Sequence, residues 1–475
     1  MSQIRTIFKN FSWLMFSQII TSICAFVWTI LIARYLGVSD YGILNFAISL
    51  TGIAGIIMDL GISTHIIRHI ATDFDSSSKY LGNAIPLKSI FSIISFLIVL
   101  IALILMKHDL LTIQITLLFT IERIFASITG LLNGSLQAVE EGKYQAIGNI
   151  LLNSLLLIFV LITITFNFGL YGITVSYVLA NFIVVISQYI AVKKRLSKPK
   201  LEFDKEFCKK ITIASIPFAL TSFFSLVISS IDMVMLTNLV SSYANGIYSV
   251  AYKLTSIFVT ISGVYSTVIF PVMSRFFNDE KNLLIISFEK SVKYLMLIFI
   301  PLSFAVMVYS QDIVVMFFGK EYITASSALS ILMWTVALTI LCGTCANLLN
   351  ASHKEKYVTL ILMASATLNT ILNLFIIPKY SYTGAALTTI TTDLLGTFLF
   401  LYLSYKLGAL HKQTVINLIK IFIASIILYI SLLALNLNMW IALPVGTIIY
   451  FVVIILIKTF DNDDKYIIKE ILGKN

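Results

Sequence analysis

The chain has 475 residues, of which 59% are hydrophobic and only 12% are charged. Soluble globular domains carry about 25% charged residues, so this composition excludes a soluble protein. The net charge of +10 would otherwise raise nucleic acid as a partner. The placement of the basic residues, described below, excludes that class as well.

Fourteen apolar runs follow one another along the chain, each near the roughly 20 residues that a helix needs to cross a bilayer. Backbone groups in lipid must be hydrogen-bonded within the protein, which leaves helices or a closed barrel. The runs lack the alternation of a lipid-facing strand, so we expect an all-α polytopic membrane protein. The helices are predicted at residues 11–33, 41–67, 84–106, 110–136, 145–166, 170–192, 211–236, 245–273, 287–308, 323–349, 357–377, 383–405, 415–435 and 439–457.

Basic residues are distributed unevenly between the two sides of these predicted helices. With the N-terminus inside, the cytoplasmic segments hold 27 lysines and arginines, whereas the outer segments hold four. Basic residues in short loops mark the cytoplasmic side. The counts therefore predict a multi-pass protein of the cell membrane, either plasma or inner membrane, with both termini in the cytoplasm. They explain the positive charge as topology, without a nucleic-acid partner.

Short segments of the first half recur in the second half at equivalent places in the topology. The matching pairs are Gly42–Ala47 with Gly246–Ala251, Leu131–Ser135 with Leu348–Ser352, and Leu170–Gly172 with Tyr382–Gly384. Two parallel six-helix copies are typical of transporters that bind their substrate between the copies. We expect an N-terminal lobe at 1–192, a basic cytoplasmic linker at 193–210 and a C-terminal lobe at 211–406. Two extra helices and a cytoplasmic tail follow at 407–475.

Several charged residues fall inside the predicted helices or at the first external turn. A charge at the bilayer centre costs about 2.5–3.5 kcal/mol, so such residues usually face the bundle interior or a water-filled cavity. We expect six of them to line a transport cavity between the lobes: Arg34, Glu122, Arg123, Asp232, Lys253 and Asp393. The cations suit an anionic phosphate, and the carboxylates suit uptake of a proton or sodium ion.

Two pairs within this set have a structural alternative. Asp232 and Lys253 lie at similar depth on consecutive helices, so a salt bridge between them is as plausible as a transport role. Glu122 and Arg123 are adjacent and point about 100° apart on a helix, so we do not expect them to face each other.

Three further charges are candidates for a gate or an interface. Asp40 flanks the first external turn, whereas Asp59 and Arg68 lie towards the cytoplasmic surface. Cys342 and Cys345 form a C-x-x-C without a second pair or a nearby histidine. We therefore expect no metal site and no resident cofactor, apart from possible coupling to a proton or sodium ion.

Short motifs across the chain resemble the polysaccharide transporter branch of the multidrug/oligosaccharidyl-lipid/polysaccharide exporter superfamily, the Wzx-type O-antigen or repeat-unit flippases. The motifs are Ala33–Gly37 with Tyr41-Gly42, Asp59–Gly61 with Arg68–Ala71, and Ile231-Asp232 with Gly246–Leu254. Fourteen helices in a six-plus-six repeat with two added helices are similar to that superfamily's fold.

The resemblance implies that a lipid-linked oligosaccharide, carried on a polyprenyl (di)phosphate, passes from the cytoplasmic to the outer leaflet by alternating access. It implies no catalytic residue, and it names the lipid bilayer and other polysaccharide-assembly membrane proteins as partners. Related lipid II flippases carry several arginines in the cleft of the N-terminal lobe. Here only Arg34 and Arg123 match that pattern, which disfavours a peptidoglycan precursor.

Two alternatives stay open from the sequence. A cation-coupled multidrug exporter of the same fold would favour carboxylates over arginine in its cavity, and the mixed set here argues against it. A membrane polysaccharide polymerase or glycosyltransferase would need a large external loop or paired carboxylates. The longest predicted outer stretch, residues 309–322, separates Asp312 from Glu321 by an apolar run, which disfavours an enzyme.

Overall fold

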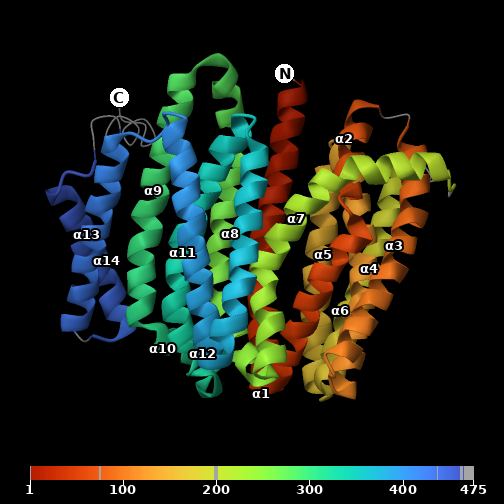
Figure 1. Cartoon of the computed structure of the whole chain (residues 1–475), viewed down its shortest axis with the longest axis horizontal. Coiled ribbons are helices and arrows are strands. Elements are labelled where there is room, and N and C mark those ends of the chain that lie inside the picture. Colours follow the sequence, from red (N-terminus) through yellow and green to blue (C-terminus); the bar gives the residue numbers. More distant parts are fainter. Residues whose placement is uncertain (1, 74–75, 197–201, 436, 461–463, 465–475) are drawn as a thin grey trace. The chain divides into compact units, whose positions relative to one another are not determined.

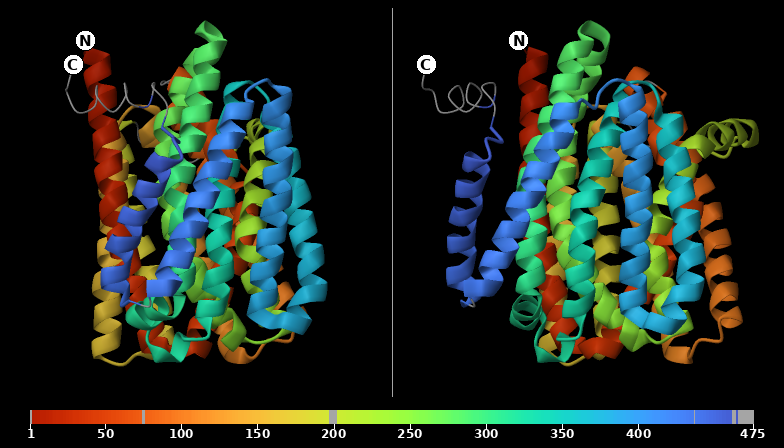
Figure 2. Two further views of the ribbon diagram at one scale, coloured as in Figure 1. Left: turned by 90° about the vertical axis from the view of Figure 1, so that its left-hand side faces the viewer. Right: turned by 60° about the vertical axis from the view of Figure 1, so that its left-hand side comes forward.

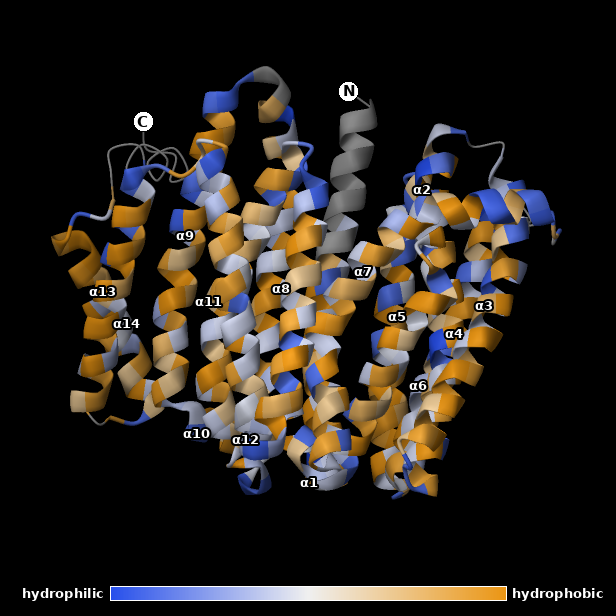
Figure 3. Cartoon of the chain, in the orientation of Figure 1, coloured by the Kyte–Doolittle hydropathy of each residue, from blue (hydrophilic) through white to orange (hydrophobic). Residues whose placement is uncertain are grey.

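The computed structural model describes residues 2–73, 76–196, 202–435, 437–460 and 464, and every regular element in these ranges is a helix (Figure 1). The elements are α1 (Ser2–Asp59), α2 (Ile62–Thr72), α3 (Ser77–Leu105), α4 (Leu110–Ala138), α5 (Gly142–Thr165), α6 (Gly169–Arg195), α7 (Lys205–Leu239), α8 (Ser242–Asp279), α9 (Lys281–Val308), α10 (Ser310–Phe318), the 3₁₀ helix η1 (Lys320–Tyr322), α11 (Ala325–Ala351), α12 (Glu355–Lys406), α13 (Lys412–Leu435) and α14 (Met439–Leu456). In the described part, twelve helices are long and apolar enough to cross a membrane. Figure 3 shows hydrophobic residues along most of their length and hydrophilic residues gathered near their ends.

Two of the twelve helices are too long for a single crossing. A straight helix of 52 residues, the length of α12, would extend about 78 Å, more than twice the roughly 30 Å of a hydrocarbon core. The backbone leaves helical geometry at Gly37 in α1, where φ is 71°, and at Ser381 in α12, where φ is 53°. Each of these helices therefore supplies two membrane-length stretches. The described chain provides fourteen, which confirms the predicted polytopic all-α fold.

One predicted span was wrong at its C-terminal end. The span at 41–67 stops at Asp59, because Leu60 and Gly61 adopt positive φ values of 44° and 74°. A Cβ on Gly61 would lie only 2.6 Å from the Ser215 carbonyl oxygen, so the backbone of α7 leaves no room for a side chain at this position. The isoleucines that follow belong to the separate helix α2 and are buried one turn apart at positions 62, 66 and 70.

By internal packing, the chain divides into two compact units. Unit 1 comprises residues 1–249 and 373–382, and unit 2 comprises residues 250–372 and 383–475. Helix α7 belongs to unit 1 because it packs on α1 and α2. The predicted lobes at 1–192 and 211–406 have other limits and stay a prediction.

Two glycines at repeat-equivalent positions let α1 and the start of α8 cross closely within unit 1. A Cβ on Gly42 would lie 1.8 Å from the Ser242 carbonyl oxygen, and a Cβ on Gly246 would lie 2.0 Å from the Val38 carbonyl oxygen. Both contacts join positions related by the same offset of 204, so each maps onto the other when the two segments are exchanged. The Asn245 amide also donates to the Gly42 carbonyl over 2.8 Å. The repeat seen in the sequence is therefore a pseudo-symmetric contact here.

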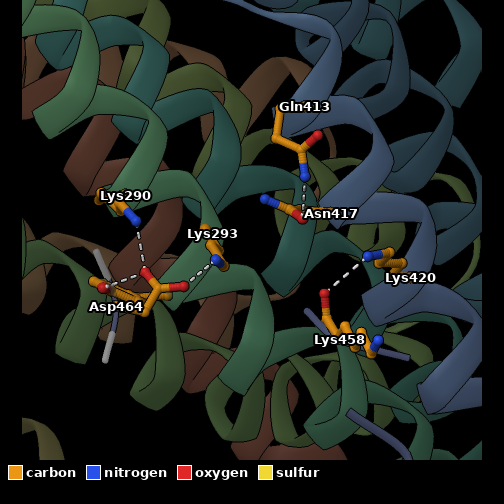
Figure 4. A network of polar contacts seen from close by, with 8 residues as sticks. Lys290, Lys293, Gln413, Asn417, Lys420, Lys458 and Asp464 are labelled. Carbon is orange, nitrogen blue, oxygen red and sulfur yellow. Dashed lines mark hydrogen bonds and ion pairs between the residues drawn. The ribbon is translucent and has the colours of Figure 1, made fainter. Parts of the chain in front are cut away.

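In unit 2, the two C-terminal helices are held through α9. Helices α13 and α14 run side by side, and α13 packs against α9 (Figure 2). The Tyr450 hydroxyl donates to the Leu297 carbonyl over 2.9 Å. Beyond α14, the fully buried Asp464 carboxylate accepts from Lys290 at 2.7 Å and pairs with Lys293 (Figure 4). The extra helices are thus fastened to α9 by buried polar contacts.

The glycine crossing generates a stability prediction. We expect Gly246→Ala to lower the free energy of unfolding of the detergent-solubilised protein by about 1–3 kcal/mol and its melting temperature with it. The added methyl group overlaps a carbonyl that cannot move without shifting α1. Fluorescence-detected size-exclusion chromatography after heating would measure the loss.

Gly263→Ala is the matched control, since it lies in the same helix and a Cβ there would meet nothing within 4 Å. We expect it to be neutral or stabilising by up to about 1 kcal/mol, because alanine favours a helix over glycine. Equal stability of the two variants would contradict the close crossing.

Candidate functional site

A cavity of about 340 Å³ lies within unit 1, between α1, α2, α4 and α7. This volume lies in the range of roughly 300–1,000 Å³ that is usual for small-molecule sites. Small residues make the space, among them Gly52, Gly55 and Gly130, and the charged residues Asp59 and Arg123 line it. A cavity with charged walls inside membrane helices is unusual enough to be a functional candidate.

Arg123 enters the cavity from α4 and lies along the glycine face of α1. Cβ positions on Gly52 and Gly55 are each 4.0 Å from atoms of the Arg123 side chain. Arg123 Nε lies 3.6 Å from Oε2 of the buried Glu122. This Nε atom has no hydrogen-bond partner in the described part of the chain. Glu122 Oε1 accepts from the Asn181 amide of α6 over 2.9 Å.

The prediction that Glu122 and Arg123 do not face each other was wrong. Their Cα–Cβ bonds diverge, but the long arginine side chain folds back, so that its Nε approaches the neighbouring carboxylate. The result is an ion pair between adjacent residues that has one buried member, Glu122, and one member that is a third exposed, Arg123.

Asp59 lines the cavity near the end of α1 and is paired with Lys88 of α3. The Lys88 ammonium is 1% exposed and lies 2.5 Å from Asp59 Oδ1. It also donates to Ser63 Oγ at 3.0 Å and to the Ser127 carbonyl oxygen at 2.8 Å. An ammonium has three N–H donors, and all three are used. The Asp59 side chain itself is 32% exposed.

Sequence reasoning missed Lys88, which it counted among the cytoplasmic basic residues. Lys88 falls a few residues inside the predicted span 84–106, and Asp59 falls near the cytoplasmic end of the preceding predicted span. Opposite charges at similar depth on consecutive helices were the available signal. The same comparison of depths was made for Asp232 and Lys253 but not for this pair.

The electrostatics of the cavity follow from these pairs. The cavity-lining carboxylate, Asp59, is compensated by Lys88, and the cavity-lining guanidinium, Arg123, is partly compensated by Glu122. The walls therefore carry little net charge but offer both hydrogen-bond donors, from Arg123, and acceptors, from Asp59.

Asp232 belongs to a second polar cluster of unit 1, away from the residues that line the cavity. Its carboxylate is 3% exposed and accepts from the Tyr248 hydroxyl at 2.7 Å and from the Asn373 amide at 2.5 Å. Lys253 belongs to unit 2, so its pairing with Asp232 stays a prediction.

Asp393 lies in unit 2, where it forms part of a polar contact between α11 and α12. The Thr339 hydroxyl donates to Asp393 Oδ2 over 3.2 Å, and Cys342 Sγ lies 3.2 Å from Thr397 Oγ1 one turn further along. Asp393 is thus half-buried within its own unit.

The other predicted residues of unit 1 do not line the cavity. Arg34 is exposed and Asp40 is half-buried in α1. Arg68 is exposed on α2, where its guanidinium lies 4.8 Å from the centre of the Phe218 ring. Burial, with His69 and Arg68 alongside, lowers the pKa of His65 on the same helix. Within unit 1, the cavity lining therefore includes Arg123, with Glu122 beside it, and Asp59, whereas Arg34, Asp40, Arg68 and Asp232 are outside the lining.

Comparison with known proteins gives two family matches. Residues 7–277 match the family described as polysaccharide biosynthesis protein, and residues 217–375 match the MatE family. The capsular polysaccharide biosynthesis protein CapF of Staphylococcus aureus is 28% identical, over 84% of this chain and 99% of its own length. A putative O-antigen transporter of Shigella flexneri is 22% identical, over 86% of this chain and 100% of its own.

Solved structures share the fold. The lipid II flippase MurJ in an inward closed conformation superposes with a TM-score of 0.78 at 16% identity, over 94% of this chain and 98% of its own. An inward-facing multidrug resistance MATE family transporter superposes with a TM-score of 0.65 at 14% identity, over 82% of this chain and 95% of its own. Because the first family match spans more than half of the chain, this multi-pass membrane protein belongs to the polysaccharide biosynthesis protein family.

Proposed function

We propose that the protein is a flippase that moves lipid-linked oligosaccharide repeat units, carried on a polyprenyl diphosphate, from the cytoplasmic to the outer leaflet of the cell membrane by alternating access. Both termini are then cytoplasmic. The observation that carries the proposal is the unit 1 cavity, in which Arg123 presents N–H donors and the lining carboxylate Asp59 is neutralised by Lys88.

The physical task is to carry a hydrophilic head group past hydrocarbon. An unsatisfied hydroxyl or amide costs several kcal/mol in an apolar medium, and a sugar chain carries many. A polar cavity replaces their water, while the lipid tail stays in the bilayer. A guanidinium binds phosphate oxygens with two parallel hydrogen bonds, which suits Arg123 to the anionic part of the cargo.

The relatives support this assignment. CapF is named for capsular polysaccharide biosynthesis, and a relative in Haloferax volcanii, 24% identical over 77% of this chain, is named a probable low-salt glycan biosynthesis flippase. Flipping breaks no bond, so no catalytic residue is proposed. Other membrane proteins of polysaccharide assembly are the proposed partners.

A multidrug exporter is the second candidate, because residues 217–375 match the MatE family. Such an exporter binds cations and would present an uncompensated carboxylate to its cavity. Asp59 is instead held by Lys88, which favours the polysaccharide assignment. Proton or sodium coupling through Glu122, Asp232 or Asp393 remains part of the proposal.

The test is complementation of a bacterial strain that lacks its own O-antigen flippase. We expect the chain to restore surface polysaccharide and to clear the accumulated lipid-linked intermediate. A well-inserted protein that clears no intermediate in strains with several different repeat units, but expels cationic dyes, would overturn the proposal in favour of drug export.

Arg123 supplies a residue-level prediction. We expect Arg123→Ala to slow clearance of the intermediate by about 10- to 100-fold, because a hydrogen bond to a charged group contributes about 1.5–3 kcal/mol. Arg123→Lys keeps the charge but loses the bidentate geometry, so its rate of clearance should lie between those of the wild type and Arg123→Ala.

Glu122→Gln with Arg123→Gln removes both members of the ion pair and leaves no buried carboxylate uncompensated. It should flip as poorly as Arg123→Ala while keeping normal amounts of protein in the membrane. Arg195→Ala removes an exposed arginine outside the cavity and should flip normally. Full activity of the double variant would contradict a role for the guanidinium.

A further inference from the structure

We propose that the unit 1 cavity contains a sugar-recognition subsite, in which the Asp59 carboxylate accepts hydrogen bonds from hydroxyl or N-acetyl N–H groups of the sugar next to the cargo's phosphate. The inference rests on the proposed function, since it names what the same cavity recognises besides phosphate. It concerns Asp59, which the sequence placed only at a gate or an interface.

The Asp59 carboxylate keeps acceptor capacity beyond its contacts with Lys88 and Ser63. The two side-chain donors that contact it, Lys88 Nζ and Ser63 Oγ, both lie 2.5 Å from Oδ1. An ionised carboxylate has about four lone-pair sites over its two oxygens. The two side-chain donors and the backbone N–H of Ser63 occupy three of these sites. Because the side chain is a third exposed and lines the cavity, a further acceptor site is left for a donor that enters it.

Lys88 keeps this acceptor ionised. Its ammonium is buried beneath the cavity wall, and its three donors are taken by Asp59, Ser63 and the Ser127 carbonyl. A proton on Asp59 would leave a buried ammonium without its counter-ion, which is strongly unfavourable. Asp59 is therefore a permanent acceptor rather than a carrier of protons.

Two further groups of the cavity complete a site for a sugar phosphate. Ser127 Oγ is buried and has no hydrogen-bond partner among the described residues, and it lies in the wall next to Arg123. A serine hydroxyl can donate or accept. The guanidinium of Arg123 offers only donors. Arg123 thus suits phosphate oxygens, and Asp59 suits the hydroxyl donors of a pyranose.

The probes are sugar 1-phosphates, which carry both groups without a lipid. Isothermal titration calorimetry on the full-length protein in detergent would compare inorganic phosphate with the 1-phosphates of glucose, galactose, N-acetylglucosamine and N-acetylgalactosamine. We expect at least one sugar phosphate to bind about tenfold more tightly than inorganic phosphate, as one hydrogen bond to a charged group allows. Equal binding of all five probes would overturn the subsite.

The decisive variant is Asp59→Asn combined with Lys88→Met. It removes both charges of the buried pair, a change that is often neutral for stability, whereas removal of one partner leaves a buried charge. We expect the ratio of the affinity for the preferred sugar phosphate to the affinity for inorganic phosphate to fall from about ten to about one. If this double variant kept the preference, Asp59 would not be a hydrogen-bond acceptor for the sugar.

Glu141→Gln with Arg195→Gln is the matched control, because it removes an exposed ion pair of 3.9 Å in the same unit, outside the cavity lining. It should keep both the affinity and the preference. If this control lost the preference as completely as the Asp59→Asn/Lys88→Met variant, the assignment would also be overturned.

The binding assay and the complementation assay separate the two proposals. Rescue of a flippase-deficient strain without any sugar preference in vitro would leave the flippase function and remove the subsite. A sugar preference that depends on Asp59, without rescue in any strain, would support the subsite and remove the flippase function.

Discussion

One buried ammonium group joins four helices of unit 1. Lys88 projects from α3 and binds Asp59 of α1, Ser63 of α2 and the Ser127 carbonyl of α4. A lysine in this position must have its charge and all its donors satisfied, because water is not available to it. The break at Leu60 and Gly61 separates the helix that carries Asp59 from the helix that carries Ser63, and the ammonium contacts both. The cavity is the space that remains on the open side of the pair.

The same constraint governs the other buried charges of both units. Glu122 is held by Asn181 and Arg123, and Asp232 by Tyr248 and Asn373. In unit 2, the Asp464 carboxylate pairs with two lysines of α9. Only 12% of the chain is charged, so each such residue carries a large part of the specificity of packing. Apolar contacts between helices gain little from the hydrophobic effect in a membrane, because lipid tails are as apolar as the side chains they replace.

The sequence predicted those features that depend on hydropathy and on local pattern. Fourteen membrane-length stretches followed from apolar runs, and the Gly42 and Gly246 segments stood out as a repeat before their contact was visible. The sequence could not give features that depend on tertiary approach. The span at 41–67 was predicted as one helix through Gly61, whereas the helix ends at Asp59, where the backbone of α7 leaves no room for a side chain at residue 61. Lys88 appeared to be a cytoplasmic lysine, because nothing local indicates that three helices surround it.

The predicted cavity set illustrates the same limit. Helical geometry placed Glu122 and Arg123 on diverging directions, which is correct for their Cβ atoms and wrong for the ends of their side chains, because arginine is long and flexible. Depth alone could not separate Asp59, which lines the cavity, from Arg34, which does not. Such distinctions require the rotation of each helix about its own axis, and that is set by its neighbours.

Partial charge compensation also suits a protein that must release what it binds. A transported group needs an attraction strong enough to enter a site and weak enough to leave it, a balance that also governs conduction through channels. A cavity with several free arginines would hold a diphosphate firmly. Here Glu122 lies 3.6 Å from Arg123 Nε and reduces the field of the guanidinium. In the proposed function, the phosphate is therefore attracted by one attenuated cation. The sugar adds hydrogen bonds that water can replace at the outer leaflet, so affinity is divided among contacts that can be broken one at a time.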